Sequence, residues 1–121
     1  MKKRVLIVDD SATDRQQLTS LLQKQGYAVT AAVDGEDALE KIAAEPPPLV
    51  VLDIILPRMN GYQVLRQLKS SPETKDIKVI LVSSKNQESD RYWGLRQGAD
   101  DYIAKPYPEK ALLNAVAKHL Q

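Results

Sequence analysis

The sequence predicts an α/β protein built around one parallel β-sheet. Short aliphatic runs alternate along the chain with segments whose apolar residues recur at helical spacing, and this alternation is typical of repeated βα units. The chain has 121 residues, 43% of them apolar and 27% charged. These values fit one soluble globular domain over residues 1–121 with a single core.

Five segments are expected to form the strands. The three central strands are predicted at residues 5–8, 49–52 and 79–82, where continuous runs of Val, Leu and Ile indicate burial on both faces. The segments at 28–32 and 102–104 contain fewer Val, Leu and Ile residues. We therefore expect them to flank the central strands.

Four helices are predicted from apolar residues three or four positions apart. These residues are Leu18, Leu21 and Leu22; Ala38, Leu39 and Ile42; Val64, Leu65 and Leu68; and Leu112, Leu113, Val116 and Leu120. Gly26 and Gly98 follow helical segments at positions where a left-handed C-terminal cap is expected.

The remaining helix, at about residues 87–97, is the most weakly specified. It contains Gly94 and a polar first turn, and its large apolar residues are only Tyr92, Trp93 and Leu95. We expect this helix to be the most mobile of the five. Trp93 can be either an anchor for a partner or a half-buried core residue.

Composition excludes several classes of function. The absence of cysteine excludes disulfides, thiolate zinc sites and thiol catalysis. The net charge of +1 gives no reason to expect nucleic acid or an anionic membrane as a partner. The basic residues 2–4 precede only four apolar residues, fewer than the roughly 7 to 15 of a signal peptide. A cytoplasmic protein without membrane insertion is expected.

Polar side chains stand where four of the strands end, and in an open parallel sheet ligands bind at the carboxyl ends of the strands. These side chains are Asp9 and Asp10, Asp53, Ser83 and Ser84, and Lys105. Each has an ordinary alternative role. Asp10 or Ser11 can cap a helix, Asp53 can begin a turn, Ser83 can bind nearby backbone, and Lys105 can be solvated.

Together, three carboxylates at one edge of a sheet require a cation. Two unit charges 4 Å apart repel by about 4 kcal/mol at an effective dielectric constant of 20. With only oxygen ligands and no His or Cys nearby, Mg²⁺ is the natural choice.

The residues at these strand ends match a known family. The stretches LIVDDS at 6–11, LDIILPRMNG at 52–61, VSS at 82–84 and DYIAKP at 101–106 resemble the receiver domain of bacterial response regulators. The resemblance covers essentially the whole chain. It implies a flavodoxin-like (βα)5 doubly wound parallel sheet with the strand order 2-1-3-4-5.

The resemblance also implies roles at the site. Asp53 would be the phosphoacceptor, and Asp9 and Asp10 would be the acidic pair that binds Mg²⁺ with Asp53. The backbone carbonyl of Ile55 would complete the metal shell. Lys105 and Ser83 would meet oxygens of the phosphoryl group.

Three further roles follow from the same resemblance. Ser83 and Tyr102 would form the switch: a phosphoryl group would draw the loop after Ser83 toward the site and open space into which Tyr102 turns. The Lys105–Pro106 peptide would be cis. Ile55 and Lys85 would flank the path of the hydrolytic water and so set the lifetime of the phosphoryl group.

The implied function is that of a phosphorylation-activated response regulator of a two-component phosphorelay, not an enzyme acting on outside substrates. Its partners would be a sensor histidine kinase of the chemotaxis type and a protein target that binds the fourth helix, fifth strand and fifth helix. A stand-alone receiver, monomeric or weakly dimeric, is expected. Residues 85–99 are similar to receivers of the type IV pilus chemotaxis-like pathway that controls twitching motility.

Three other interpretations are weaker. A haloacid-dehalogenase-like phosphatase also uses a strand-end Asp with Mg²⁺, but its second Asp would fall at Ile55. A nucleotide-binding fold lacks both glycine-rich phosphate motifs. A receiver-like scaffold without phosphorylation would not need the full set of polar strand ends. His119 stands alone in the last helical turn, where a basic side chain favours the helix dipole, and is not expected to relay phosphate.

Overall fold

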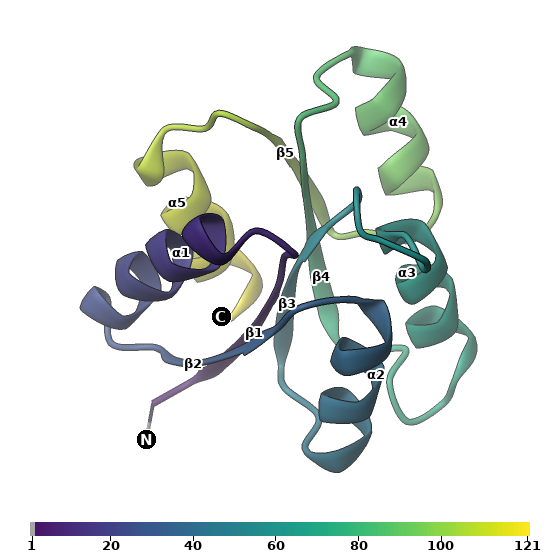
Figure 1. The fold of residues 1–121 in the computed structure, drawn as a ribbon, viewed down its shortest axis with the longest axis horizontal. Coiled ribbons are helices and arrows are strands. Elements are labelled where there is room, and N and C mark those ends of the chain that lie inside the picture. Colours follow the sequence, from purple (N-terminus) through teal and green to yellow (C-terminus); the bar gives the residue numbers. More distant parts are fainter. Residues whose placement is uncertain (1) are drawn as a thin grey trace.

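In a computed structural model that describes residues 2–121, five parallel strands form one sheet in the order β2-β1-β3-β4-β5 (Figure 1). The predicted fold class and strand order are therefore confirmed. The strands are β1 (Arg4–Val8), β2 (Ala28–Ala32), β3 (Leu49–Asp53), β4 (Lys78–Ser83) and β5 (Asp101–Ala104). The helices are α1 (Ala12–Lys24), α2 (Gly35–Ala44), α3 (Gly61–Ser70), α4 (Glu88–Arg96) and α5 (Glu109–His119).

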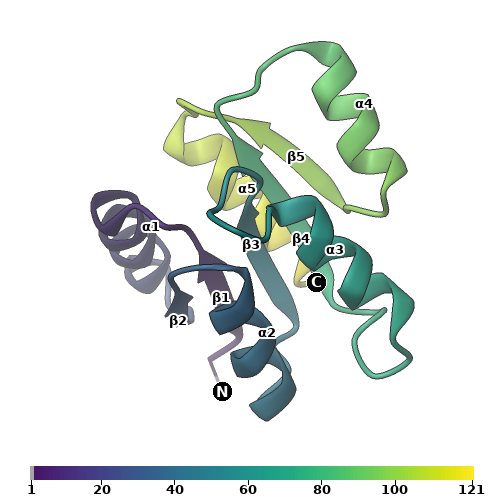
Figure 2. The ribbon, with the colours of Figure 1, turned by 45° about the vertical axis from the view of Figure 1, so that its right-hand side comes forward.

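Helices cover both faces of the sheet, α1 and α5 on one side and α2, α3 and α4 on the other (Figures 1 and 2). Alternate residues of a strand point to opposite faces. In β1, Val5 and Ile7 pack toward α1 and α5, whereas Leu6 and Val8 pack toward α2 and α3. The continuous aliphatic runs are therefore explained by two cores, one on each face.

Local signals fix where the helices begin and end. Ser11 caps α1, since its side chain accepts a hydrogen bond from the backbone N–H of Asp14 at 3.2 Å. Asn60 begins α3 in a capping box with Gln63. Gly26 and Gly98 have φ values of 92° and 109°, which confirms the expected left-handed conformation after a helix.

The register of the strands brings the polar strand ends to one level. Val8 pairs with Leu52, so Asp9 and Asp53 follow at the same height. Ser83 pairs with Ala104, which directly precedes Lys105. The convergence of these side chains is thus a consequence of parallel pairing.

Helix α4 forms as expected, but its large apolar residues lie outside the core. Tyr92 and Trp93 are 64% and 50% exposed, and Leu95 also lies on the surface. The buried residue of α4 is Gly94. Trp93 therefore belongs to neither core, and its role as a partner anchor stays a prediction, as does the mobility of the helix.

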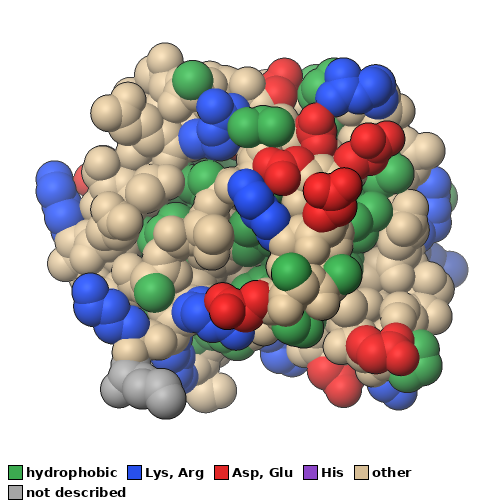
Figure 3. Space-filling model, turned by 60° about the horizontal axis from the view of Figure 1, so that its bottom comes forward, with side chains coloured by type: hydrophobic (Ala, Val, Ile, Leu, Met, Phe, Trp, Pro, Cys, Tyr) green, Lys and Arg blue, Asp and Glu red, His purple; other side chains and the backbone are tan. Residues whose placement is uncertain are grey.

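Charges of both signs lie on the surface. The face in Figure 3 shows a group of Asp and Glu side chains in its upper half, with a Lys or Arg side chain directly beside it near the centre and others toward the rim. Among residues 2–121, no helix combines the length and the apolar character needed to cross a bilayer.

Candidate functional site

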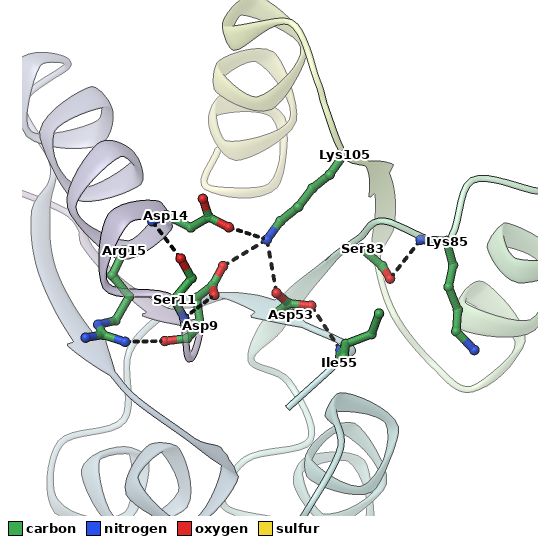
Figure 4. Close-up of polar contacts among 9 residues, drawn as sticks. All are labelled: Asp9, Ser11, Asp14, Arg15, Asp53, Ile55, Ser83, Lys85 and Lys105. Atoms are coloured by element: carbon green, nitrogen blue, oxygen red, sulfur yellow. Dashed lines mark hydrogen bonds and ion pairs between the residues drawn. The ribbon is translucent and has the colours of Figure 1, made fainter. Parts of the chain in front are cut away.

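The candidate site lies at the carboxyl edge of the sheet, over β1, β3, β4 and β5 (Figure 4). Asp9, Asp53 and Ser83 are buried there, whereas Asp10 is exposed. Polar side chains at this depth need partners, because burying an unpaired charge is costly. The partners come from the ends of neighbouring strands and from the first turn of α1.

Lys105 connects the carboxylates. Its Nζ lies 3.0 Å from Asp9 Oδ2, 3.0 Å from Asp53 Oδ2 and 3.1 Å from Asp14 Oδ2 (Figure 4). An ammonium group has three hydrogen-bond donors, and each has a carboxylate within reach. The alternative in which Lys105 is simply solvated is therefore wrong.

Asp53 is held by the turn that follows β3. Its Oδ1 accepts a hydrogen bond from the backbone N–H of Ile55 at 2.9 Å. The chain then returns so closely that a Cβ on Gly61 would lie 2.4 Å from the Asp53 carbonyl oxygen and 2.7 Å from Ile54 Cα. Only glycine fits at the start of α3, and this close approach fixes the backbone beneath Asp53.

Two residues of α1 that were not among the predicted site residues also join the site. Asp14 binds Lys105, and Arg15 Nη1 donates to the Asp9 backbone oxygen at 2.8 Å. The Asp9 side chain itself accepts from the N–H of Ser11 at 2.9 Å. The available signal was that α1 begins directly after the acidic pair, so its first turn faces the same edge.

Three acidic side chains are close enough to share a cation. Asp9, Asp10 and Asp53 each place one carboxylate oxygen within 4.8 Å of the others. An all-oxygen, carboxylate-rich donor set suits a hard divalent cation such as Mg²⁺. The residues present therefore fit the metal implied by the sequence.

Burial and ion pairing act against each other on the titrating groups of the site. Burial raises the pKa of Asp53 above its ordinary value, although the hydrogen bond from Lys105 opposes the shift. Burial by itself would lower the pKa of Lys105, but the bonds to Asp9 and Asp53 outweigh it, and the pKa is raised. Lys105 is thus a fixed positive charge beside the Asp53 carboxylate.

The β4 side of the site is more open. Ser83 Oγ accepts from the backbone N–H of Lys85 at 3.1 Å, so the alternative of a local backbone contact holds for this hydroxyl. The Lys85 side chain points away from Asp53 (Figure 4). Ile55 lies beside Asp53 and is 51% exposed. The Lys105–Pro106 peptide bond is cis.

Tyr102 lies inside the molecule rather than outside it. The side chain is 3% exposed, and its hydroxyl donates to the Lys85 backbone oxygen at 2.8 Å. The family resemblance implies that a phosphoryl group opens the space for this ring. In the structure the ring belongs to the core that α2 and α3 also form, and it lies against Gly94 of α4. The effect of a phosphoryl group on the ring stays a prediction.

A five-stranded parallel sheet with three carboxylates, a hydroxyl and a lysine at its carboxyl edge defines a class of α/β proteins with an acidic site at the strand ends. Comparison with known proteins specifies the family. Residues 5–117 match the model of the response regulator receiver domain. The chain belongs to this family.

Relatives and solved structures agree. The chain is 46% identical to Protein PilH of Pseudomonas aeruginosa over 113 residues, 93% of each chain. It is 39% identical to Protein PilG of the same organism over 117 residues, covering 97% of this chain and 87% of PilG.

The fold matches the chemotaxis protein CheY4 of Vibrio cholerae with a TM-score of 0.90 at 26% identity, over 98% of each chain. It also matches a CheY-like response regulator receiver domain protein from Methanospirillum hungatei. There the TM-score is 0.90 at 32% identity, over 99% of this chain and 94% of the other.

Proposed function

We propose that this protein accepts a phosphoryl group from a histidine kinase on Asp53 and passes the signal to a protein partner. The observation that carries the proposal is the Lys105 ammonium, 3.0 Å from both Asp9 and Asp53. It places a permanent positive charge where a phosphoryl group on Asp53 would carry its negative charge.

In the reaction, an Asp53 oxygen attacks the phosphorus of a phosphohistidine. A P–O bond forms as the P–N bond to the imidazole breaks, which gives a mixed anhydride on Asp53. Lys105 pairs with one oxygen of the transferred group. Ser83, which is buried beside the site, exchanges its contact with Lys85 for a hydrogen bond to another of these oxygens.

Asp9, Asp10 and Asp53, with the Ile55 backbone carbonyl, would hold Mg²⁺. When bound, the metal supplies positive charge that offsets the charge of the phosphoryl oxygens. Without it, the three carboxylates repel an incoming anion. The fit of this donor set to Mg²⁺ rests on the proximity of the acidic oxygens.

The output surface is proposed at α4, β5 and α5. Tyr92 and Trp93 are exposed on α4, and aromatic residues are frequent anchors of protein interfaces. The similarity to PilH and PilG supports a role in control of motility by type IV pili, with a chemotaxis-type kinase as donor. We propose a cytoplasmic protein, monomeric or weakly dimeric, without nucleic acid as a partner.

The test is phosphorylation with acetyl phosphate and Mg²⁺, followed by mass spectrometry. The natural protein should gain one acid-stable, base-labile phosphoryl group, and chelation of Mg²⁺ should prevent it. Asp53→Asn should abolish the adduct, whereas Asp76→Asn, the same change at an exposed carboxylate, should not. Stoichiometric labelling retained in Asp53→Asn at another residue would overturn the assignment.

We also propose that Ile55 and Lys85 prolong the phosphorylated state. An aliphatic side chain beside Asp53 cannot orient a water, and the Lys85 ammonium can swing over the phosphoryl group and pair with it. The double variant Ile55→Asn with Lys85→Glu should lose phosphate faster in excess Mg²⁺. A decay rate equal to or slower than that of the natural protein would refute this account of the lifetime and leave Asp53 as the acceptor.

A further inference from the structure

Tyr102 is bound at two points, once through its ring hydroxyl and once through its backbone. Its hydroxyl donates to the Lys85 backbone oxygen at 2.8 Å, which ties the ring to the loop between β4 and α4. Its own backbone oxygen accepts from Arg91 Nη1 of α4 at 2.7 Å. The ring hydroxyl therefore ties β5 to the loop that precedes α4, whereas the backbone of Tyr102 ties β5 to α4 itself.

Gly94 provides the space that the ring occupies. A Cβ at this position would lie 2.8 Å from Tyr102 Cδ2 and 3.0 Å from Leu81 Cδ1. Leu81 is completely buried in the sheet, so it has little room to move aside. The ring is the group that has to yield, because β5 is an edge strand with no further strand beyond it.

This glycine has a cost that packing must offset. Glycine is less favourable than alanine inside a helix, because it loses more backbone freedom on folding. The φ of Gly94 is not positive, so the backbone itself does not require glycine. The close approach of the Tyr102 ring is the feature of this structure that does.

We propose that Gly94 is the positioning residue that admits the Tyr102 ring beneath α4, so that this single position determines whether the ring rests inside or outside. A side chain at 94 expels the ring and breaks its bond to Lys85, which releases the loop after Ser83. The placement of the ring follows from geometry alone. Its consequence for signalling rests on the proposed function.

The test compares the acetylation of tyrosine hydroxyls by N-acetylimidazole in the natural protein and in Gly94→Ala, read residue by residue by mass spectrometry. Tyr92, which is exposed, is the internal reference. In the natural protein, Tyr102 should react at least about tenfold more slowly than Tyr92, because it is buried. In Gly94→Ala, the rate at Tyr102 should approach that at Tyr92. Unchanged protection of Tyr102 would overturn the proposal.

Thermal unfolding gives a second, independent test. If the Tyr102 ring fills the space beside Gly94, Gly94→Ala should lower the midpoint temperature of unfolding in the natural protein. In a Tyr102→Ala background the same change should raise the midpoint temperature, because the ring is gone and only the better helix propensity of alanine remains. A midpoint raised in both backgrounds contradicts the proposal. Tyr102→Phe keeps the ring but removes the hydroxyl that bonds to the Lys85 backbone oxygen, so the midpoint of this variant gives the effect of the lost hydrogen bond alone.

The outcome can be separated from that of the proposed phosphorylation. Acetylation and unfolding are measured without a phosphoryl group, so they stand whether or not Asp53 is the acceptor. The final extent of acetyl phosphate labelling of Gly94→Ala should match that of the natural protein, because Asp53, Lys105 and the acidic pair keep their contacts; only the rate of labelling should respond to the released loop. Loss of that labelling with Tyr102 still protected would show that Gly94 acts on the site and not on the ring, and would refute the proposal.

Discussion

Helices α3 and α4 cover the same face of the sheet but are packed in different ways (Figure 2). Helix α3 directs three large aliphatic residues, Val64, Leu65 and Leu68, into the core. Helix α4 buries only Gly94 and directs its large apolar residues outward. Similar helix lengths therefore conceal very different amounts of buried apolar surface.

The difference between the two helices indicates which part of the fold can move at the lower cost in free energy. Burying a Leu or Val side chain contributes roughly 1.5 to 3 kcal/mol, and α4 has no such residue in the core. A helix with few buried apolar contacts opens at a lower free energy than the rest of the domain. Asp53, the proposed phosphoacceptor, thus lies next to the firmly packed α3, whereas the proposed output surface includes the helix that costs least to move.

The largest expected effect is on stability. Leu65→Ala removes a completely buried side chain of α3 and should lower the free energy of unfolding by about 2 to 5 kcal/mol. The same change at Leu95 of α4, which is exposed, should cost less than about 0.5 kcal/mol. Urea unfolding of both variants provides the measurement. Equal losses would break the comparison between the helices.

Native-state hydrogen exchange tests the same difference without mutation. The amides of α4 should exchange at least about tenfold faster than those of α3, equivalent to a difference in opening free energy of roughly 1.4 kcal/mol or more. Exchange followed by NMR in low denaturant resolves the two helices. If both helices opened only with the whole domain, α4 would not be a separately movable element.

The capping box at the start of α3 provides a further test of the comparison between α3 and α4. Asn60 accepts from the Gln63 N–H at 3.0 Å, and the Gln63 side chain accepts from the Asn60 N–H at 2.9 Å. Asn60→Ala should cost about 1 kcal/mol. Asn86→Ala, in the exposed loop before α4, is the matched control and should change stability by less than about 0.5 kcal/mol. A similar loss at both sites in thermal unfolding would argue against the cap.

The smallest expected effect concerns Asp37 in the first turn of α2, which packs beside α3. Its bond from the Val33 N–H holds the pKa of this carboxyl below its ordinary value of 3.8, and Lys41 also lowers it. A lowered pKa means that the ionised form stabilises the folded state. This contribution is present above pH 3.8 and is lost as the pH falls through the lower folded-state pKa.

Asp37→Asn should therefore cost a few tenths of a kcal/mol at pH 7. The two proteins should converge in stability as the solution is acidified below the ordinary pKa. Denaturant unfolding at a series of pH values provides the measurement. A difference that persists unchanged at the acid end would show that the charge of Asp37 is not responsible.

The prediction of the strands succeeded for a local reason. The runs at 5–8, 49–52 and 79–82 are aliphatic on both sides of the strand, and a parallel sheet covered by two layers of helices requires this pattern. The polar residues that end these runs were then expected at one edge by the rule for parallel sheets. The contact of Lys105 with Asp9 and Asp53 follows from that placement.

The sequence by itself determined the strands, the helices with regular apolar spacing and the acidic edge, because these depend on periodicities within single segments. The tertiary structure alone decided which residue of α1 contacts Lys105 and which side chain packs against Gly94. Asp14 and Lys105 are 91 positions apart in the sequence, and no pattern within a single segment predicts a contact between residues so far apart. Gly94 weakens its helix when considered alone, yet it makes room for a ring from β5, because the fit of two elements depends on where the whole core places them.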